Sequence, residues 1–326
     1  MSRSTLLALL ADGRFRSGQD MADGLGVSRT AVWKQLNRLA SEAGVELESV
    51  RGRGYRIPGG LDLLDTAALR RLMKPPAAGL LGDLVVLDTV DSTNAEAQRR
   101  AEAGAGGGLV VTAEQQSAGR GRRGRRWVSP FGRNIYLSVL WDFEQGATAL
   151  EGLSLAVGVA VVRALGQQGI EGIELKWPND ILHHRAKLGG ILLEMSGDAA
   201  GACRAIVGVG INVSMPQAAA ADIDQRWTDL AAVSDGRPPA RNALLAALLD
   251  ELLPLLADFG TSGFPPWRDA WQCLDAFAGA PVVLETGGRT MAGTARGVDE
   301  RGALCLETAT GQCAIYGGEI SLREVT

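Results

Sequence analysis

The sequence has few of the residues that mark a metal-binding, disulfide-bonded or membrane-spanning protein. Its 326 residues include two histidines and four cysteines, at Cys203, Cys273, Cys305 and Cys313. The cysteines show no C-x-x-C spacing and no pairing with histidine, which favours reduced structural thiols over a metal site. The most apolar helical stretch, 152–165, is short and interrupted by Arg163, so it predicts a buried helix rather than a membrane span. The apolar start of the chain leads into no small-residue cleavage site, so we expect no signal peptide and a cytoplasmic location.

The charge that is present is distributed unevenly. The net charge is −4 at pH 7, yet residues 1–60 carry nine Lys/Arg against six Asp/Glu, a net of +3, which leaves −7 for the remainder. This asymmetry predicts a basic module attached to an acidic body. With 46% apolar and 21% charged residues, the chain is otherwise ordinary for a globular protein of two or three domains.

Residues 17–39 predict two short helices joined by a turn. Met21, Leu25 and Val27 supply apolar contacts, Gly26 stands where the chain must turn, and Ser28 can cap the second helix. Helical spacing gives that second helix an apolar face made of Ala31, Val32, Leu36 and Leu39.

The opposite face of the second helix carries side chains that can reach phosphates and base edges in a major groove. They are Arg29, Thr30, Trp33, Lys34, Gln35 and Asn37, with Trp33 bulky for a base contact. The following stretch, 45–58, alternates like a β-hairpin with a basic tip. These features are typical of a winged helix-turn-helix, and a small helical interaction module is the alternative. The expected DNA-binding residues are Ser28, Arg29, Thr30, Lys34, Gln35, Arg51 and Arg53.

Pro58 and two glycines mark a linker, after which strand-like and helical stretches alternate. We expect strands at 84–90, 108–115, 134–141, 173–180, 187–195 and 203–213, and helices at 93–104, 151–169 and 241–259. This pattern predicts an α/β or α+β domain with a central sheet. Five short strand-like stretches near the end of the chain are typical of an SH3-like barrel. The expected domains of this α+β multidomain protein are 1–62, 63–272 and 273–326.

The most basic stretch, QQSAGRGRRGRRWVSPFG at 115–132, holds five arginines, four glycines and no acidic residue. Gly119, Gly121 and Gly124 spell the G-x-G-x-x-G of dinucleotide-binding turns, but Pro130 and Gly132 oppose the helix that this motif requires. No Walker loop is present, and a disordered RNA-binding arm is the less favoured alternative for a stretch between two strands. We interpret it as a loop, mobile until an anion binds, whose glycines let backbone N–H groups approach a ligand while arginines neutralise it.

Three further polar motifs lie in the same domain. D-S-T-N places Ser92, Thr93 and Asn94 at a helix start, where they suit a neutral polar ring or a plain helix cap. The segments K-W-P-N-D (176–180) and K-L-G-G (187–190) add lysines, an amide, a carboxylate and glycines near strand ends. The histidines, His183 and His184, are expected in a solvated turn beside Arg185.

Together these motifs resemble the bifunctional biotin–protein ligase and biotin operon repressor family. The resemblance runs from SGQDMADGLGVSRTAVWKQL through DSTN, QQSAGRGRRGRRW, KWPNDI, KLGGIL and GVGINV to GGEISLR. It implies a class II synthetase-like biotin/lipoate ligase domain that converts biotin and MgATP to biotinyl-5′-AMP and pyrophosphate. Biotin then passes to a lysine of the biotin carboxyl carrier protein. The resemblance also implies that biotinyl-5′-AMP is the corepressor that promotes dimerisation on operator DNA.

The resemblance also implies residue roles. Biotin contacts are expected from Ser92, Thr93, Asn94, Gln116, Arg120, Gly121, Arg122, Lys187 and Gly190, and nucleotide contacts from Arg122, Asn179, Asn212 and Trp227. Lys187 is the expected cation beside the reacting carboxylate and α-phosphate, with Lys176 and Asp180 as further catalytic residues. A salt bridge to Asp180 explains Lys176 equally well, and core packing is nearly as good an explanation of Trp227. Asp180 itself suits Mg²⁺ or the acceptor lysine.

Two other functions fit parts of this pattern. A lipoate–protein ligase would share the catalytic scaffold, but it should lack the basic loop at 115–132, here called the arginine loop, and the N-terminal module. A biotin-sensing repressor without ligase activity would keep both, and transfer of biotin to a carrier domain would separate it from a ligase.

Overall fold

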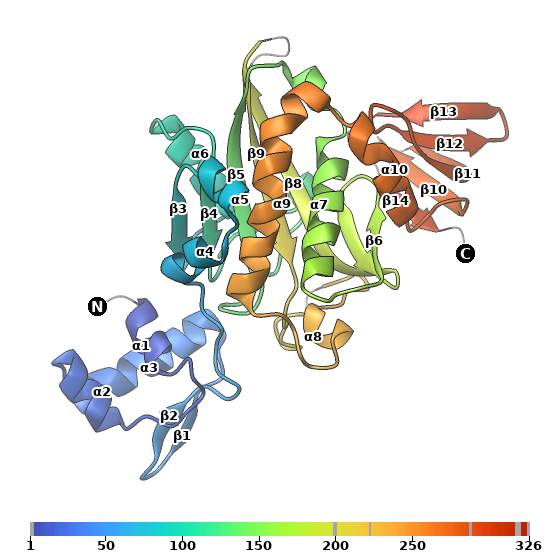
Figure 1. The fold of residues 1–326 in the computed structure, drawn as a ribbon. Helices are drawn as coiled ribbons and strands as arrows, with labels where there is room; N and C mark the ends of the chain where they lie inside the picture. Colours follow the sequence, from blue (N-terminus) through green and yellow to red (C-terminus); the bar gives the residue numbers. More distant parts are fainter. Residues whose placement is uncertain (1–2, 198–200, 222, 287–288, 317–320, 325–326) are drawn as a thin grey trace.

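The computed structural model describes residues 3–197, 201–221, 223–286, 289–316 and 321–324. A small N-terminal module of helices and a hairpin precedes a seven-stranded sheet with helices, and a five-stranded sheet follows (Figure 1). This arrangement confirms the predicted α+β multidomain fold. The sequence also predicts a turn at Gly287–Gly288, between two of the C-terminal strands, and these two residues lie outside the described residues.

The N-terminal module holds the two predicted helices and the predicted hairpin. It consists of α1 (Arg3–Leu9), α2 (Gly18–Leu25), α3 (Arg29–Ala43), β1 (Glu48–Val50) and β2 (Gly54–Arg56). Ser28 caps α3 by accepting a hydrogen bond from Ala31 N at 3.1 Å, and Gly26 ends α2 in the left-handed conformation with φ 66°. Helix α1 was not predicted, because its apolar run was considered only as a leader sequence.

Helix α3 buries three of the four residues of its predicted apolar face, and the fourth, Ala31, is half-buried. Val32, Leu36 and Leu39 are at most 1% exposed and belong to the core of the module, while Trp33 on the other face is 50% exposed. Trp33 therefore does not pack into this core. At the hairpin, the guanidinium of Arg53 lies 4.1 Å from the ring centre of Phe15. Such cation–π contacts hold the basic hairpin against the rest of the module.

The central sheet has the strand order β3-β4-β5-β9-β8-β7-β6. Only β3 and β4 are parallel, which makes the domain α+β rather than α/β. The strands are β3 (Leu84–Leu87), β4 (Leu109–Ala113), β5 (Ile135–Phe143), β6 (Ile173–Lys176), β7 (Asp180–His183), β8 (Ala186–Gly197) and β9 (Cys203–Ile211).

Strand β7 corrects the prediction that both histidines lie in a turn. His183 is the last residue of β7, and the turn to β8 is formed by His184 and Arg185, with φ values of 47° and 63°. K-W-P-N-D was predicted to lead from a strand into a turn. In the structure it forms the turn between two antiparallel strands, in which Lys176 pairs with Asp180.

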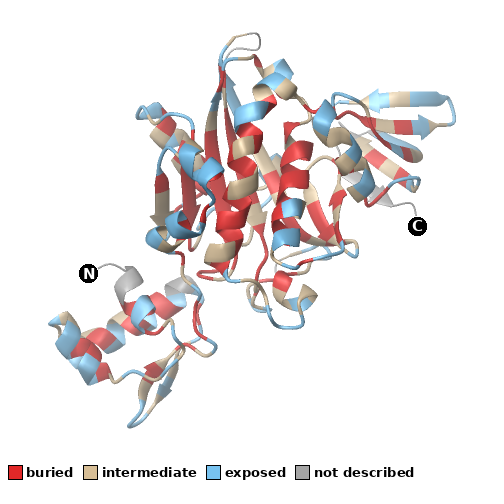
Figure 2. Ribbon diagram, in the orientation of Figure 1, coloured by how far each residue is buried: buried red, intermediate tan, exposed pale blue. Residues whose placement is uncertain are grey.

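Helices cover both faces of the central sheet. Helices α7 (Leu153–Gln167) and α9 (Arg241–Ser262) pack on one face, and α6 (Thr93–Glu102) packs on the other, over Leu109, Val111 and Ile206. Buried residues run along α7 and α9 (Figure 2). The segment 147–167 has the length and hydropathy to cross a membrane, but it lies in this core, as predicted for 152–165.

Shorter helices and a second sheet complete the fold. The helices are α4 (Thr66–Leu72), α5 (Pro75–Leu80), α8 (Leu230–Val233) and α10 (Pro265–Leu274), with 3-10 turns η1 (Arg122–Gly124) and η2 (Ala147–Leu150). The five-stranded antiparallel sheet is formed by β10 (Pro281–Thr286), β11 (Arg289–Val298), β12 (Leu304–Thr308), β13 (Gly311–Ile315) and β14 (Ser321–Glu324). Trp177, the buried residue of the K-W-P-N-D turn, ties the two sheets together by donating to Gly302 O at 3.0 Å.

A buried ion pair anchors the linker between the N-terminal module and the central domain. Arg241, at the start of α9, lies 2.6 Å from Glu114 Oε2, and both side chains are at most 4% exposed. Arg241 also donates to Asp62 O at 2.6 Å and to Asn134 O at 2.7 Å, and Glu114 Oε1 accepts from Leu64 N at 2.5 Å. The ion pair therefore satisfies backbone groups of the linker that folding removes from water.

Removal of the negative member of this pair should destabilise the protein. Glu114→Gln leaves the Arg241 charge buried without its counter-ion, and we expect the free energy of unfolding to fall by about 3–5 kcal/mol in urea denaturation. The matched change Glu307→Gln breaks an exposed ion pair with Arg296, also 2.6 Å long, and should cost about 0–1 kcal/mol. Equal losses in the two variants would contradict the assigned role of burial.

Candidate active site

One cavity of about 690 Å³ opens on the face of the central sheet that carries α6. The first turn of α6, the loop between β4 and β5, the β6–β7 turn, β8 and the segment after β9 all contribute to its wall. Every residue that the sequence predicted for the catalytic, biotin and nucleotide sites lines this one cavity, namely Ser92, Thr93, Asn94, Gln116, Arg120, Gly121, Arg122, Lys176, Asn179, Asp180, Lys187, Gly190, Asn212 and Trp227.

The floor of the cavity follows from the register of β8, β9 and β5. Side chains alternate along a strand, so the odd-numbered residues of β9 enter the core under α7 and α9, and the even-numbered residues face the cavity side. The cross-strand rows on that side are Gly190–Gly210–Tyr136, Leu192–Gly208–Ser138 and Glu194–Ile206–Leu140. The middle strand therefore has no side chain at Gly208 and Gly210, where the floor lies.

Other side chains occupy the space above these two glycines. A Cβ atom at Gly208 would lie 2.4 Å from Asn94 Oδ1, and one at Gly210 would lie 2.7 Å from the indole ring of Trp127. Both distances are shorter than real contacts, so the two glycines are needed for Asn94 and Trp127 to lie against the sheet.

Ser92, Thr93 and Asn94 are all buried at the start of α6. Ser92 occupies the N-cap position, but its side chain makes no capping hydrogen bond, so the helix-cap interpretation holds for its position only. The oxygen of Ser138 lies 2.6 Å from Asn94 Oδ1 and 2.8 Å from Thr93 Oγ1. Ser138 was not predicted, because a lone serine in an apolar strand gives no sequence signal.

Gln116 continues these hydrogen bonds toward the arginine loop. Its Oε1 accepts from Thr93 N at 2.9 Å and from Thr93 Oγ1 at 3.2 Å, and its Nε2 donates to Ser129 Oγ at 3.1 Å. Ser129 in turn donates to Trp127 O at 3.0 Å. A continuous chain of polar contacts therefore links the first turn of α6 to the base of the loop.

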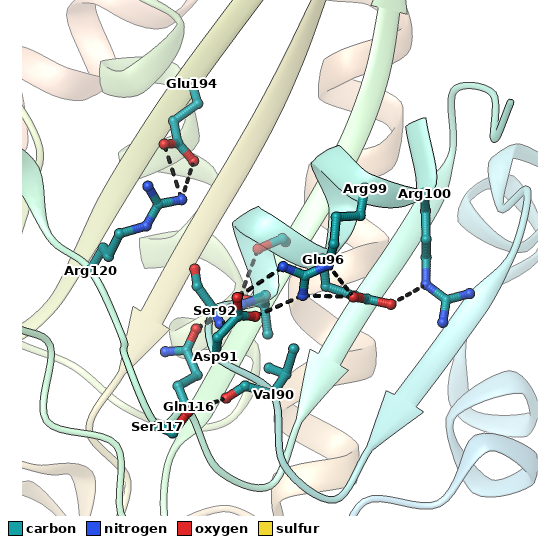
Figure 3. Close-up of polar contacts among 12 residues, drawn as sticks. Val90, Asp91, Ser92, Glu96, Arg99, Arg100, Gln116, Ser117, Arg120 and Glu194 are labelled. Atoms are coloured by element: carbon teal, nitrogen blue, oxygen red, sulfur yellow. Dashed lines mark hydrogen bonds and ion pairs between the residues drawn. The ribbon is translucent and has the colours of Figure 1, made fainter. Parts of the chain in front are cut away.

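The start of α6 is also held from outside the cavity. Asp91 and Arg99 form two parallel contacts of 2.8 and 2.7 Å, which Figure 3 shows beside Ser92. The hydrogen bonds from Arg99 lower the pKa of Asp91 to about 2. Asp91 therefore remains a carboxylate at neutral pH and fixes the segment that presents Ser92 to the cavity.

The arginine loop connects β4 to β5 without an intervening α-helix, which confirms that the G-x-G-x-x-G match is not a dinucleotide-binding turn. The loop folds back on itself: Trp127 N donates to Gly119 O at 2.8 Å, and Gly121 N donates to Arg125 O at 2.7 Å. All five of its arginines line the cavity, at 120, 122, 123, 125 and 126. That the loop is mobile until an anion binds stays a prediction.

Arg122 is half-buried, whereas the other four loop arginines are exposed. Burial lowers its pKa below the ordinary value, the charge of Arg123 lowers the pKa further, and Asp180 opposes both effects. The guanidinium lies 3.4 Å from Asn179 Oδ1. An anion beside Arg122 would stabilise the charged form that burial disfavours.

Two lysines flank the carboxylate of Asp180. Lys187 Nζ lies 2.6 Å from Asp180 Oδ1, whereas Lys176 Nζ lies 4.0 Å from Asp180 Oδ2. The closer salt-bridge partner of Asp180 is therefore Lys187, and Lys176 stands at the limit of an ion pair. The chain has only four lysines among its 33 basic residues, and these two both line the cavity.

Beyond the lysines, the cavity wall contains buried polar atoms without partners. Within the part of the chain that the structure describes, Asn212 Oδ1 and Trp127 Nε1 are both buried without a hydrogen-bond partner. Asn212 Nδ2 donates to Thr228 O at 3.0 Å, which fixes the orientation of the amide and leaves Oδ1 as its unpaired atom.

Trp227 lines the cavity and is not part of the hydrophobic core, which argues against the core-packing alternative. Trp127 was not predicted, although it ends the G-R-G-R-R-G-R-R-W string.

The predicted DNA-binding residues lie on the N-terminal module, away from this cavity. Arg29, Thr30, Lys34, Arg51 and Arg53 are exposed, and Gln35 is half-buried. Ser28 is exposed as a residue, but its hydroxyl caps α3. Since α3 and the β1–β2 tip carry these groups, the module presents a helix and a basic hairpin to solvent.

Comparison with known proteins agrees with these features. Residues 86–212 match the Biotin/lipoate A/B protein ligase family, residues 2–56 match an HTH domain, and residues 277–323 match the Biotin protein ligase C terminal domain. The chain is 40% identical to the Bifunctional ligase/repressor BirA of Salmonella typhimurium over 98% of this chain and 97% of that protein. It is 33% identical to the protein of the same name from Bacillus subtilis, over 96% and 95% of the two chains.

A solved structure shares the fold of most of this chain. The biotin protein ligase from Aquifex aeolicus in complex with biotin and ATP superimposes with a TM-score of 0.64 at 30% identity, and covers 75% of this chain and 100% of its own. The fold and the cavity therefore define a protein ligase of the biotin/lipoate class that carries a helix-turn-helix module. More narrowly, the chain belongs to the family of bifunctional biotin ligase/repressor proteins.

The glycine floor gives a stability prediction. Gly208→Ala places a methyl group where Asn94 Oδ1 lies, so it should lower the free energy of unfolding by about 1–3 kcal/mol. Gly166→Ala is the matched control, because Gly166 is helical and a Cβ there meets nothing within 4 Å; we expect it to be neutral or stabilising by about 0.4–1 kcal/mol. Urea denaturation of the two variants beside the parent protein is the measurement, and a fully stable Gly208→Ala variant would contradict the packing argument.

Proposed function

We propose that this chain is an ATP-dependent biotin–protein ligase that also represses transcription of biotin synthesis genes. It forms biotinyl-5′-AMP, transfers biotin to a lysine of the biotin carboxyl carrier protein, and uses biotinyl-5′-AMP as corepressor. The observation that carries this proposal is the single cavity, which gathers the arginine loop and the three other polar motifs into one site. The repressor role is supported by the helix-turn-helix match and by relatives named ligase/repressor that align over nearly the whole chain.

The polar floor suits the ureido ring of biotin. Ser92, Thr93, Asn94 and Gln116 present hydroxyl and amide groups at the buried end of the cavity, and a neutral ring with both donors and acceptors can pair with them. Leaving such a group buried without a partner costs about 1–3 kcal/mol, which gives this end its selectivity for a polar ring.

The first step requires two anions to meet. An oxygen of the biotin carboxylate attacks the α-phosphorus of ATP; a new P–O bond forms, the bond from that phosphorus to the bridging oxygen breaks, and pyrophosphate leaves. In our assignment, Lys187 and Arg122 are the cations at this junction, and Arg120, Gly121 and Gly190 contact the carboxylate and phosphate groups. Fixed positive charge contributes most where negative charge concentrates in the transition state. No histidine lines the described part of the cavity, and a carboxylate nucleophile requires no general base.

The donor set suits Mg²⁺ brought in with the nucleotide. No cluster of three metal-ligating side chains occurs among the described residues, whereas Mg²⁺ held mainly by substrate phosphates needs only one or two carboxylates. Asp180, which lines the cavity beside Lys187, is the carboxylate that would hold it. The ion would supply neutralisation of the phosphate oxygens.

The second step transfers biotin to the acceptor lysine. The lysine amine attacks the carbonyl carbon of the mixed anhydride; a C–N bond forms, the C–O bond to AMP breaks so that AMP leaves, and the amine loses a proton to water. In our assignment, Asp180 orients the incoming lysine. Lys176, whose Nζ lies 4.0 Å from Asp180 Oδ2, balances the negative charge of Asp180. Arg120 and the remainder of the loop shield the anhydride from water until the acceptor arrives.

The adenosine part is assigned to the part of the cavity lined by Asn179, Asn212 and Trp227. Asn212 Oδ1, which is buried without a partner within the described chain, can accept a hydrogen bond from the exocyclic amine of adenine. Trp227 offers a ring face for stacking, and Asn179, already within 3.4 Å of Arg122, lies beside the phosphates.

The N-terminal module is assigned to operator DNA in a cytoplasmic protein. The side chains proposed to contact the duplex are Ser28, Arg29, Thr30, Lys34, Gln35, Arg51 and Arg53. Contacts from arginine and lysine to phosphates make binding salt-dependent, and a homodimer loaded with biotinyl-5′-AMP would present two such modules to a symmetric site.

Two measurements on the intact chain test this function. Mass spectrometry of a carrier domain incubated with the protein, biotin and MgATP should show one biotin on its acceptor lysine, and lipoate in place of biotin should support far less pyrophosphate release. A gel shift with operator DNA should strengthen when biotinyl-5′-AMP is added. A carrier that stays unmodified would refute the ligase activity, and a shift indifferent to biotinyl-5′-AMP would refute the corepressor role.

Loss of the Lys187 charge should slow the first step. We expect Lys187→Ala to reduce the rate of biotin-dependent pyrophosphate release by about 100-fold or more, because a fixed cation at the reacting phosphate is removed. Lys74→Ala is the control, since Lys74 is exposed and lies outside the cavity. A near-normal rate in the Lys187 variant would remove Lys187 from the reaction.

Loss of the Arg122 charge should instead impair retention of the intermediate. We expect Arg122→Ala to release biotinyl-5′-AMP about tenfold faster or more, since a charge-assisted contact to the adenylate phosphate is lost. The measurement is the dissociation rate of preformed biotinyl-5′-AMP in the absence of carrier, with Arg296→Ala as the control arginine. Equal dissociation rates in the two variants would contradict the assignment.

A further inference from the structure

Glu194 stands at the edge of the cavity without lining it. It lies on β8, on the same face as Gly190 and Leu192, and its carboxylate contacts two groups of the proposed biotin site. Its Oε2 accepts from Asn94 Nδ2 at 2.8 Å, and its Oε1 lies 3.3 Å from Arg120 Nη2. Figure 3 shows the Glu194 carboxylate facing the Arg120 guanidinium. No sequence motif indicated this residue.

The contact with Asn94 fixes which way the amide of Asn94 points. A carboxylate only accepts hydrogen bonds, so the NH₂ group of Asn94 must face Glu194. The amide oxygen then faces Ser138 Oγ, 2.6 Å away, and it occupies the space that a Cβ atom at Gly208 would need. Without Glu194, Asn94 Nδ2 would keep only a contact of 3.4 Å with Leu192 O.

The orientation of Asn94 is passed on to the floor of the cavity. Ser138 lies between Asn94 Oδ1 and Thr93 Oγ1, and Thr93 donates to Gln116 Oε1. An inverted Asn94 amide would place its NH₂ group against the Ser138 hydroxyl and change the direction in which that hydroxyl donates. The donors and acceptors offered to a ligand by Thr93 and Gln116 would change with it.

Of the two contacts, the one with Asn94 should dominate. Asn94 is 3% exposed, and a buried polar group left unpaired is costly. The Arg120 and Glu194 side chains are 47% and 38% exposed, so their ion pair is screened by water and salt and should contribute little.

From these contacts we infer that Glu194 is a positioning residue for biotin binding: its carboxylate orients the Asn94 amide, and it secondarily holds Arg120 of the loop beside the sheet. The inference rests on the proposed function for the identity of the ligand, but the orientation of Asn94 can be tested without a ligand. Since Glu194 does not line the cavity, its loss should affect binding of biotin more than the rate of the chemical step.

The first test compares Glu194→Ala with Glu194→Gln in the full-length chain. Glu194→Ala should raise the KM for biotin about tenfold, with kcat of pyrophosphate release within about twofold of the parent. Glu194→Gln keeps an oxygen that accepts from Asn94 Nδ2, so its KM should stay within about threefold. Glu307→Ala, which removes an exposed glutamate paired with Arg296, is the control and should leave both constants unchanged.

A double-mutant cycle asks whether Glu194 acts through Asn94. If it does, Glu194→Ala should change the KM for biotin by less than about threefold in an Asn94→Ala background, because the oriented group is already absent. A full tenfold effect in that background would overturn the inference. So would a parent-like KM for Glu194→Ala, or an equal loss in the alanine and glutamine variants.

The second test reads the position of Asn94 in ligand-free protein. The side-chain amide signals of Asn94 in a ¹H–¹⁵N spectrum, identified by their disappearance in Asn94→Ala, should move toward free-amide positions in Glu194→Ala and stay near their parent positions in Glu194→Gln. Unchanged signals in Glu194→Ala would overturn the positioning role even if the parent enzyme turns over biotin. Shifted signals in a chain whose parent form does not use biotin would leave Glu194 as the positioning residue and refute the proposed function instead.

Discussion

The active-site cavity depends on a packing constraint in β9, the central strand of its floor. Alternation sends Val207, Val209 and Ile211 into the core under α7 and α9, and leaves Gly208 and Gly210 on the opposite face. The missing side chains at these two glycines let Asn94 and Trp127 approach the sheet, closer than any Cβ atom would allow. The polar floor, the folded arginine loop and the ion pair of Lys187 with Asp180 all lie around the space that these two glycines leave free. The chemistry of the site therefore depends on a strand whose side chains fill the core on one face and are absent at two positions on the other face.

Electrostatics organises the rest of the cavity. Five loop arginines and two lysines line it, and Asp180 is the carboxylate that lies between the lysines. Burial is the main cause of the lowered pKa of Arg122, and repulsion from the neighbouring charge of Arg123 lowers this pKa further. An anionic ligand relieves the cost of burying this charge, which is why the site suits a carboxylate and phosphates together. The same physics separates Arg241, whose buried charge has a buried partner and a structural role, from Arg122, whose charge faces the cavity.

Sequence reasoning predicted most of this organisation but not its connections. The helices α6, α7 and α9 and six of the seven strands of the central sheet have strong periodic or apolar signals, and each was predicted close to its observed place. Strand β7 was missed because K-W-P-N-D and the two histidines read as turn residues, although Lys176 and Asp180 are paired across a hairpin. Helix α10 was missed because it begins with two prolines, Pro265 and Pro266; both fit the first turn of a helix, where no backbone donor is needed. Ser138, Trp127 and Glu194 escaped detection because each acquires its role only through a partner distant in sequence.

The sequence by itself determined which groups are available: an anion-binding loop rich in glycine and arginine, a set of short polar motifs, and a capped helix, α3, with side chains suited to DNA. It also showed a family resemblance strong enough to indicate the reaction. This was possible because caps, turns and motif spacings depend on residues close together in the chain, so they can be recognised before the fold is known. Only the tertiary structure decided that Lys187 rather than Lys176 pairs closely with Asp180, that Asn94 is oriented by Ser138 and Glu194, and that Arg241 anchors the linker. Those relations depend on strand register and on burial, which are properties of the packed sheet and not of any one segment of the chain.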